Sequence, residues 1–572
     1  MKYSSSAFSV RVRILSSLFV CAALLLSLRL YFVQIVHGGE YQKKARGQYE
    51  EISEKRNDRN DIFFSKKEGD LVAAAVMQAG WVLAIVPAEI SNPEEVFDKL
   101  SAITSLDRKR FFASVAKVGD PHEDIGFRIG NSVAERIRKE KIPGVILVPD
   151  QWRSYPGGAL AAHAIGFVGY KGDARVGVYG LERFYEDSLA KKSDLYVNPF
   201  AEIFANVGAA LSVNPAENQG SIITSIEPQV QARMEETLSG VLKTYSSKLA
   251  AGIVMNPHTG EIIALAIRPT FDPNTYGSVD DPSLFTNILV ENIYEMGSIM
   301  KPLTVAAGID ADAITPNTTY NDKGCIERSG KKICNYDGKA RGLVGMQEVL
   351  NQSLNLGATF IADTMEHKVF SNYIRLFKFG EKTDVDLPSE ALGSIDAIDG
   401  GYDIDYASAS FGQGISMTGV GMIRGLASLA NGGLLPSPHI VKGIRLESGI
   451  VRSIAPAQSV KVLKPETVQT VSEMLVKVFD TALLGGILKQ DHYSIAAKTG
   501  TAQIAIQGGG GYYNDRFLHS FFGYFPAHDP KFIIFLMTIE PHGAEFASAT
   551  LARPFLDITK FLINYYDIAP DR

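Results

Sequence analysis

The sequence predicts an α+β protein in three parts: a single transmembrane helix, an extended mixed region, and a C-terminal domain with one central antiparallel sheet between helical layers. Three observations predict this class. A long apolar run lies near the N-terminus, a mixed region without a catalytic cluster follows it, and the C-terminal part contains strands, then helices, then strands. With 572 residues, 46% of them apolar and 21% charged, the chain is long enough for two or three hydrophobic cores.

The first element, residues 14–36, is expected to cross a membrane. Its 23 residues include only Arg29 and Gln34 as strongly polar side chains, and at about 1.5 Å per residue they span roughly 30 Å of hydrocarbon. A cleaved signal peptide is the alternative, but no small-x-small cleavage motif follows the run. Basic residues flank both ends, so the positive charges do not set the orientation of the helix in the membrane. We infer the orientation from the short N-terminal tail and from the chemistry of the motifs described below. We expect residues 1–13 in the cytoplasm and the bulk of the chain outside it, on a single-pass anchor in the inner (cytoplasmic) membrane.

Residues 40–219 are expected to form a domain without a catalytic role. A strand-like stretch at 80–87 and a charged, helix-like stretch at 133–141 indicate a small sheet with helices. Residues 199–218 contain two prolines and three asparagines, which is typical of a connection between domains.

Residues 220–572 are expected to form the second domain. Its first strands form a hairpin around a turn at 256–260, and its last apolar runs predict further strands and a closing helix. The run at 532–539 is apolar at seven of its eight positions, which is typical of a central strand. The expected strands are 251–255, 261–266, one beginning at Lys498, 518–525 and 532–539, and the expected closing helix is 551–566.

Between these strands, Ser298 and Lys301 lie three residues apart in a stretch of helix formers that follows Gly297. On a helix, this spacing places both side chains on one face with β-carbons about 5–6 Å apart, so the amine can reach the hydroxyl. Unpaired N–H groups and the helix dipole at a helix start favour developing negative charge. The pair therefore suits a serine nucleophile that carries its own base and attacks a carbonyl.

Two further motifs follow in a fixed order and narrow the chemistry. Ser-x-x-Lys and Ser-x-Asn each recur elsewhere in the chain, so neither is specific alone, but Lys-Thr-Gly occurs once. Ser353 with Asn355 comes after Ser298, and the run Lys498–Thr501 comes after both. The ordered triple is typical of penicillin-binding proteins and class A β-lactamases.

On these motifs the chain resembles class B penicillin-binding proteins, the monofunctional peptidoglycan D,D-transpeptidases. The resemblance makes 220–572 the transpeptidase domain and 40–219 the non-catalytic, dimerisation-like pedestal. Pedestal-like motifs occur at Arg153–Gly157, Gly166–Gly169 and Gly177–Glu186. An earlier motif departs from the family pattern, since Asn60 stands where the family usually has glycine.

The resemblance implies a serine acyl-enzyme mechanism. Ser298 attacks the carbonyl between the two D-Ala residues of a stem peptide, and a neutral Lys301 takes its proton. Ser353 passes a proton to the leaving D-Ala, and Asn355 holds the substrate amide. Lys498 supplies positive potential.

Substrate binding is implied for Thr499, Gly500 and Thr501. The two threonine hydroxyls bind the terminal carboxylate, and the backbone N–H groups of Ser298 and Thr501 form the oxyanion hole. The implied ligands are peptidoglycan stem peptides and β-lactams, and the implied partners are a polytopic membrane glycosyltransferase and other wall-synthesis proteins. Septal and lateral wall synthesis both remain open.

Composition excludes other classes of function. The net charge of −6 argues against a nucleic-acid partner, and three Cys and ten His without ligand spacing indicate neither a metal nor a cofactor.

A membrane-anchored β-lactamase-like hydrolase is one alternative to the transpeptidase, although such enzymes are usually soluble single domains. A catalytically silent wall scaffold is the other, and the complete triple argues against it.

Cys325 and Cys334 predict a disulfide across a hairpin. A two-residue turn at Ser329-Gly330 pairs the flanking residues outward until the two cysteines face each other. That site is non-hydrogen-bonded, with Cα atoms about 4.5 Å apart, which is within reach of a disulfide. Two reduced thiols are the alternative, because a fold with a large core does not need this link.

Overall fold

The computed structural model describes residues 59–172, 174–191, 219–506, 508 and 510–572, together with residues 24, 26 and 29. The expected membrane span 14–36 and connection 199–218 lie outside the described residues, apart from Leu24, Leu26 and Arg29, which are helical. None of the described helices is long and apolar enough to cross a bilayer. The described chain forms two compact units: the smaller holds 77–152, and the larger holds 59–76, 153–191 and the residues from 219 onward.

The smaller unit has a sheet covered by helices. Its strands are β3 (Glu123–Ile129) and most of β2 (Leu71–Ile85) and β4 (Val145–Ser154); β2 pairs antiparallel with β3 and also pairs with β4. The helices are α3 (Pro93–Ser101), α4 (Arg108–Val115) and α5 (Asn131–Glu140). Leu83, Leu100 and Phe111 belong to its buried core. The expected strand at 80–87 and helix at 133–141 are confirmed.

Three sequence motifs of the pedestal-like region meet at one buried carboxylate, Glu182, in the larger unit. Arg59 Nε lies 2.7 Å from its Oε2, Arg153 Nε lies 2.6 Å from its Oε1, and the Tyr155 hydroxyl donates to Oε1 at 3.3 Å. Burial raises the pKa of Glu182, but the two guanidinium groups outweigh burial and hold that pKa below its usual value. Both arginines therefore pair with Glu182, although Asn60 follows Arg59 in place of glycine.

Short elements surround this network. They are β1 (Ile62–Ser65), α6 (Ala162–Ile165), β5 (Val168–Lys171), β6 (Ala174–Gly177), α7 (Gly180–Phe184), α8 (Glu186–Leu189), β7 (Ser221–Thr224), β15 (Val441–Arg445) and β16 (Val451–Ser453).

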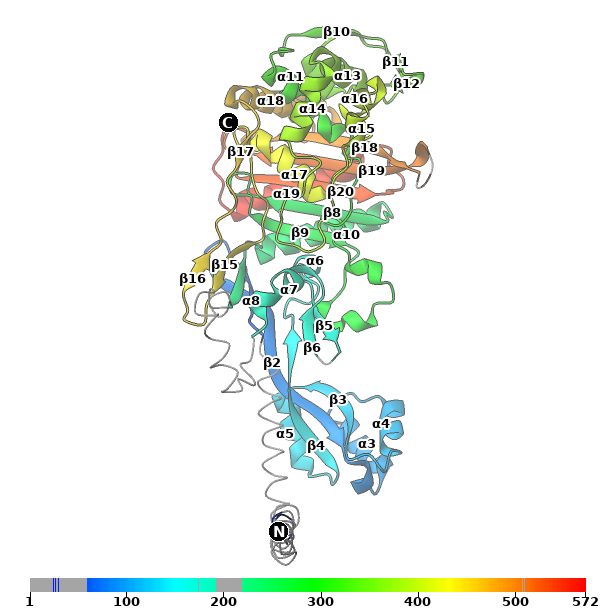
Figure 1. Ribbon diagram of the computed structural model, residues 1–572, viewed down its shortest axis with the longest axis vertical. Coiled ribbons are helices and arrows are strands. Elements are labelled where there is room, and N and C mark those ends of the chain that lie inside the picture. The colour runs from blue at the N-terminus through cyan, green and yellow to red at the C-terminus, as the bar shows by residue number, and fades with distance from the viewer. Residues whose placement is uncertain are drawn as a thin grey trace, which may run out of the picture. The chain divides into compact units, whose positions relative to one another are not determined.

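A five-stranded antiparallel sheet in the order β18-β19-β20-β8-β9 forms the centre of the larger unit (Figure 1). Its strands are β8 (Leu249–Met255), β9 (Ile262–Arg268), β18 (Ala496–Ala505), β19 (Tyr512–Phe525) and β20 (Phe532–Ile539). The expected strands are confirmed. β20 is the middle strand, and seven of its eight residues are buried, as its continuous apolar run predicted.

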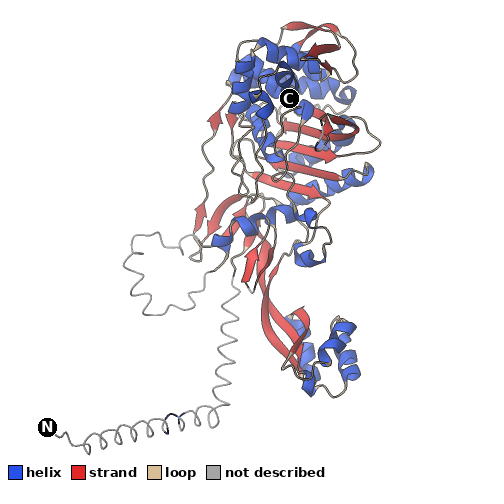
Figure 2. Ribbon diagram, turned by 45° about the vertical axis from the view of Figure 1, so that its right-hand side comes forward, coloured by secondary structure: helices blue, strands red, loops and turns tan. Residues whose placement is uncertain are grey.

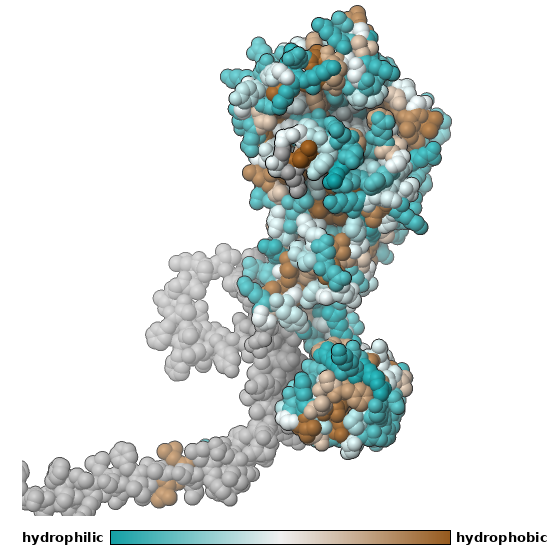
Figure 3. Space-filling model, turned by 90° about the vertical axis from the view of Figure 1, so that its right-hand side faces the viewer, coloured by the Kyte–Doolittle hydropathy of each residue, from teal (hydrophilic) through white to brown (hydrophobic). Residues whose placement is uncertain are grey.

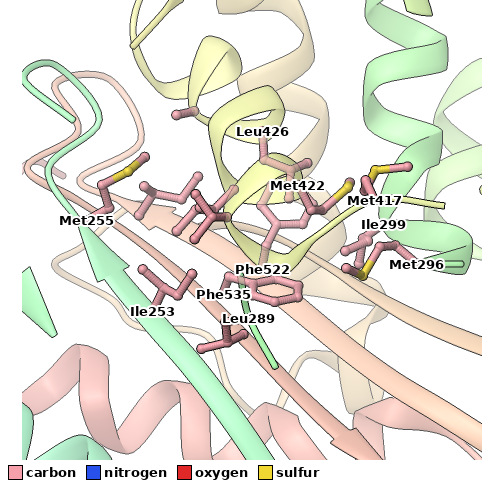
Figure 4. Close-up of a cluster of buried hydrophobic side chains, with 14 of the residues drawn as sticks. Ile253, Met255, Leu289, Met296, Ile299, Met417, Met422, Leu426, Phe522 and Phe535 are labelled. Carbon is pink, nitrogen blue, oxygen red and sulfur yellow. The ribbon is translucent and has the colours of Figure 1, made fainter. Parts of the chain in front are cut away.

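Helices cover both faces of this sheet (Figure 2). On one face lie α10 (Pro228–Thr244) and α19 (Ala547–Tyr565), and Phe521 packs there. Its neighbour Phe522 points to the other face, where it packs with residues of α17 (Gly419–Ala427) in the cluster of Figure 4. The predicted α+β architecture, with one antiparallel sheet between helical layers, is confirmed.

A helical layer beside β18 carries the remaining motif residues. Its helices include α11 (Lys301–Asp310), α12 (Met346–Asn351), α13 (Asn355–Thr364), α14 (His367–Leu376), α16 (Asp403–Ala409) and α18 (Pro465–Lys477). A hairpin of β11 (Cys325–Arg328) and β12 (Lys331–Cys334) adjoins it, and its register pairs Cys325 with Cys334. The two cysteines form a disulfide with Cα atoms 4.1 Å apart, so that prediction is confirmed.

Candidate active site

Ser298 lies in the 3-10 turn Gly297–Met300, which leads directly into α11. In a 3-10 turn, side chains three residues apart eclipse, so Lys301 stands over Ser298. Gly297 has φ +63°, and its N–H donates to the carbonyl of Gly412 at 3.0 Å. A β-carbon there would lie 3.0 Å from that of Ala502, so the close approach of the turn to β18 requires glycine.

The Lys301 amine is the centre of the site and is fully buried. Its Nζ lies 2.9 Å from Ser298 Oγ, 3.1 Å from Ser353 Oγ, 2.8 Å from Asn355 Oδ1 and 2.5 Å from the Ser353 carbonyl oxygen. The last two oxygens can only accept hydrogen bonds. A neutral amine has two N–H donors and one lone pair, so donating to both carbonyls leaves the lone pair for a hydroxyl. The nearer hydroxyl is that of Ser298, which is the geometry a general base needs.

Burial lowers the pKa of both lysines of the site. Burial, followed by the charge of Lys498, lowers the pKa of Lys301 well below its ordinary value. Burial lowers the pKa of Lys498 to about 7. Lys498 Nζ lies 3.1 Å from Ser353 Oγ and donates to the Thr499 carbonyl at 2.9 Å. The Ser353 hydroxyl therefore lies between the two amines, at 3.1 Å from each.

Ser353 adopts a backbone conformation that disfavours side chains. Its φ is +56°, in the left-handed region, between the end of α12 and the start of α13. A residue other than glycine loses about 1–2 kcal/mol there. The conformation turns both its hydroxyl and its carbonyl toward Lys301, so the strain coincides with the site.

Asn355 is fixed at both ends of its amide. Its Oδ1 accepts from Lys301, and its Nδ2 donates to the carbonyl of Cys334 at 2.9 Å. The disulfide hairpin thus sets which end of the amide faces the lysine.

β18 forms one wall of the site. Its side chains alternate, so Thr499 and Thr501 line the cleft, whereas Lys498 is buried. Gly500 packs against the nucleophile turn: a β-carbon there would lie 2.9 Å from the Met296 carbonyl oxygen. The contribution of Gly500 is therefore close packing. The Thr501 hydroxyl accepts from the N–H of Ala547 at 3.1 Å, which leaves its own hydrogen free to donate.

The cleft beside Ser298 encloses about 510 Å³. Ser353 and Asn355 also line it, so the structure brings all three predicted motifs together. Sequence reasoning assigned no role to several lining side chains, which are Tyr336, Phe411, Gln413, Gln503, Phe517, Glu545 and Phe546. Alternation along β18 could have found Gln503, but the loop residues belong to no motif that carries a chemical mechanism.

Comparison with known families decides the identity of the fold. Residues 250–559 match the family model described as the penicillin-binding protein transpeptidase domain. The chain belongs to this family. Residues 67–196 match the penicillin-binding protein dimerisation domain.

Named relatives agree with this family. Stage V sporulation protein D of Bacillus subtilis is 27% identical over 560 residues, which cover 96% of this chain and 85% of that protein. Peptidoglycan D,D-transpeptidase MrdA of Acinetobacter baumannii is 25% identical over 597 residues, covering 94% and 86%.

Solved structures share the fold. Penicillin-binding protein 3 of Mycobacterium tuberculosis superposes with a TM-score of 0.65 at 26% identity, covering 74% of this chain and 92% of that one. Penicillin-binding protein 2X of Streptococcus thermophilus has a TM-score of 0.71 at 23% identity, covering 90% and 81%. The predicted family, and with it the enzyme class of a peptidoglycan D,D-transpeptidase, is confirmed.

Proposed function

We propose that Ser298 forms an acyl-enzyme with stem peptides ending in D-Ala-D-Ala and passes the acyl group to the amine of a second stem peptide. The observation that carries this proposal is the Lys301 amine, buried among Ser298, Ser353 and Asn355 with its pKa depressed. At neutral pH such an amine accepts the Ser298 proton as the hydroxyl oxygen attacks.

During acylation, one proton moves from the Ser298 hydroxyl to the leaving D-Ala. The bond from Ser298 Oγ to the penultimate D-Ala carbonyl carbon forms, and the peptide bond to the terminal D-Ala breaks. The leaving amine takes a proton that Ser353 relays from Lys301, since the Ser353 hydroxyl lies 3.1 Å from that amine. The acceptor amine then attacks the acyl carbon: its bond to that carbon forms, the ester bond to Ser298 Oγ breaks, and a proton of the amine returns to Ser298 through Lys301, 2.9 Å away.

The substrate carboxylate binds to β18. The Thr499 and Thr501 hydroxyls face the cleft, and Lys498 behind them adds positive potential. The N–H groups of Ser298 and Thr501 form the oxyanion hole, where a lost donor typically costs about 2.7–4 kcal/mol of transition-state stabilisation.

β-Lactams acylate Ser298 in place of the peptide. Structures of penicillin-binding protein 3 of M. tuberculosis contain aztreonam or ampicillin, which supports this part of the proposal. Because the proposed reaction takes place on peptidoglycan, we also propose that the catalytic part lies outside the cytoplasm. In this arrangement, residues 1–13 form a cytoplasmic tail, 14–36 a single-pass anchor, 40–219 the pedestal and 220–572 the transpeptidase domain. A polytopic membrane glycosyltransferase is the proposed partner for glycan polymerisation.

The test measures the fate of the acyl group. We expect the purified chain to release D-Ala from a peptide ending in D-Ala-D-Ala and to keep a penicilloyl group for many minutes. Rapid turnover of nitrocefin would instead establish the β-lactamase-like alternative, and absence of both D-Ala release and labelling would establish the silent scaffold.

A further inference from the structure

A hydrogen bond outside the three motifs joins the tip of the β18–β19 hairpin to the segment before the nucleophile. The Tyr512 hydroxyl donates to the Glu295 carboxylate, at 2.9 Å from Oε2 and 3.2 Å from Oε1. Tyr512 is the first residue of β19, and Glu295 precedes Ser298 by three residues. The hairpin extends from the sheet on the side that Figure 3 faces, where hydrophilic and hydrophobic residues are interspersed.

Tyr512 and Glu295 are each other's main side-chain hydrogen-bond partner. Burial raises the pKa of Glu295, and the hydrogen bonds from the Tyr512 hydroxyl and from the Gly414 N–H lower it again. Burial, followed by the charge of Glu295, raises the pKa of Tyr512, so the phenol keeps its proton and donates. Among the residues that the structure describes, no lysine or arginine forms an ion pair with Glu295. Both side chains are half-buried, which makes this bond stronger than one at the exposed surface.

The hairpin needs such a tether because its ladder is interrupted. The pair Gln503–Phe517 is followed by the pair Ala505–Tyr512, so β18 advances by two residues where β19 advances by five. A bulge of this kind leaves the outer hairpin weakly paired to the sheet. Beyond it lies a glycine-rich tip in which Gly508 and Gly511 have φ values of +71° and +111°.

The inner part of β18 is held in a different way. Gly500 packs on the nucleophile turn, and the Ser520 hydroxyl donates to the Met296 carbonyl at 3.0 Å. Gln503, which lines the cleft, lies at the boundary between this fixed part and the bulge, and its Nε2 donates to the Tyr513 carbonyl at 3.2 Å. The outer wall of the cleft therefore depends on what fixes the hairpin tip.

We infer that Tyr512 and Glu295 are positioning residues for acylation: their hydrogen bond holds the outer part of β18 against the nucleophile segment, so that Thr501 and Gln503 face the cleft in register with Ser298. The inference rests on the proposed function of Ser298. Neither residue touches the reacting atoms, and both act through β18.

The test is the second-order rate constant for acylation of the full chain by a fluorescent penicillin. We expect Tyr512→Phe and Glu295→Ala each to lower it by about fivefold to tenfold, as loss of one ordinary intramolecular hydrogen bond predicts. The double variant should fall no further than Glu295→Ala, because that variant already removes the bond between the two side chains. Glu295→Gln should stay within about twofold of the unmodified chain, since an amide oxygen accepts the same hydrogen bond.

The matched control is Tyr513→Phe, whose ring packs against the guanidinium group of Arg516. We expect its acylation rate to be unchanged. Amide hydrogen exchange across residues 503–512 should be faster in Tyr512→Phe than in Tyr513→Phe, with equal melting temperatures. A purely structural role would instead lower the melting temperature without this local effect.

Two results would overturn the inference, and they differ from failure of the proposed function. Normal labelling of the unmodified chain with an unchanged rate in Tyr512→Phe would refute the positioning role alone. Independent, multiplicative losses in the double variant would refute it as well. If the unmodified chain were not labelled at Ser298, the proposed function would fail, and the positioning role would fail with it.

Discussion

Replacing Lys498 by methionine is expected to stabilise the fold while it removes activity. The side chain is 2% exposed, and burial lowers the pKa of its amine from 10.5 to about 7. Methionine has a similar length and carries no charge, so it avoids the cost of burying an ammonium group.

The magnitude follows from the pKa. Lowering it from 10.5 to about 7 corresponds to about 5 kcal/mol, at about 1.36 kcal/mol per pKa unit. Because the folded pKa is below the unfolded one, stability is lost as pH falls from 10.5 to about 7, and the cost is complete below that. Methionine also loses the hydrogen bonds to Ser353 and Thr499, at about 1 kcal/mol each, which leaves a net gain of about 3 kcal/mol at pH 7.

The assay is urea unfolding followed by far-ultraviolet circular dichroism at pH 7, 8 and 9. The gain of Lys498→Met should shrink by about 1.4 kcal/mol for each pH unit above 7. Lys477→Met, at an exposed position of α18, is the control and should change stability by less than about 0.5 kcal/mol at every pH. A gain that does not depend on pH, or a loss of stability at pH 7, would refute the reasoning.

Three further predictions follow from the same structure. Ser353→Gly should be about 1 kcal/mol more stable than Ser353→Ala, because glycine relieves the positive φ, and calorimetry of both variants checks this; equal melting temperatures would contradict it. Glu182→Gln should lower the free energy of unfolding by about 3–5 kcal/mol, since two buried guanidinium groups lose their common partner, and the more exposed Glu186→Gln should cost less in the same melts. Non-reducing peptide mapping should recover Cys325 and Cys334 as one linked peptide, and replacing both by serine should cost at most about 3 kcal/mol; free, alkylatable thiols would count against it.

Local patterns predicted much of the fold. The apolar run at 532–539 is β20, with the same bounds, because a strand buried on both faces is almost continuously apolar. The spacing of Ser298 and Lys301 predicted their contact because it depends only on helical geometry. The cysteine hairpin was predictable because a two-residue turn fixes its register.

Contacts between distant residues were not accessible in this way. The left-handed backbone of Ser353 and the hydrogen bond from Asn355 to the Cys334 carbonyl arise from tertiary packing. The same holds for the meeting of Arg59, Arg153 and Glu182, which are far apart in the sequence. No propensity or period encodes such pairings, so the sequence predicts the side chains of the site more fully than their support.

The most direct test of the central claim is intact-mass spectrometry of the full chain after incubation with benzylpenicillin. The account predicts one penicilloyl group on the unmodified chain, located at Ser298 by peptide mapping, and none on a folded Ser298→Ala variant. A penicilloyl group on Ser298→Ala, or its location on any other residue, would contradict the account.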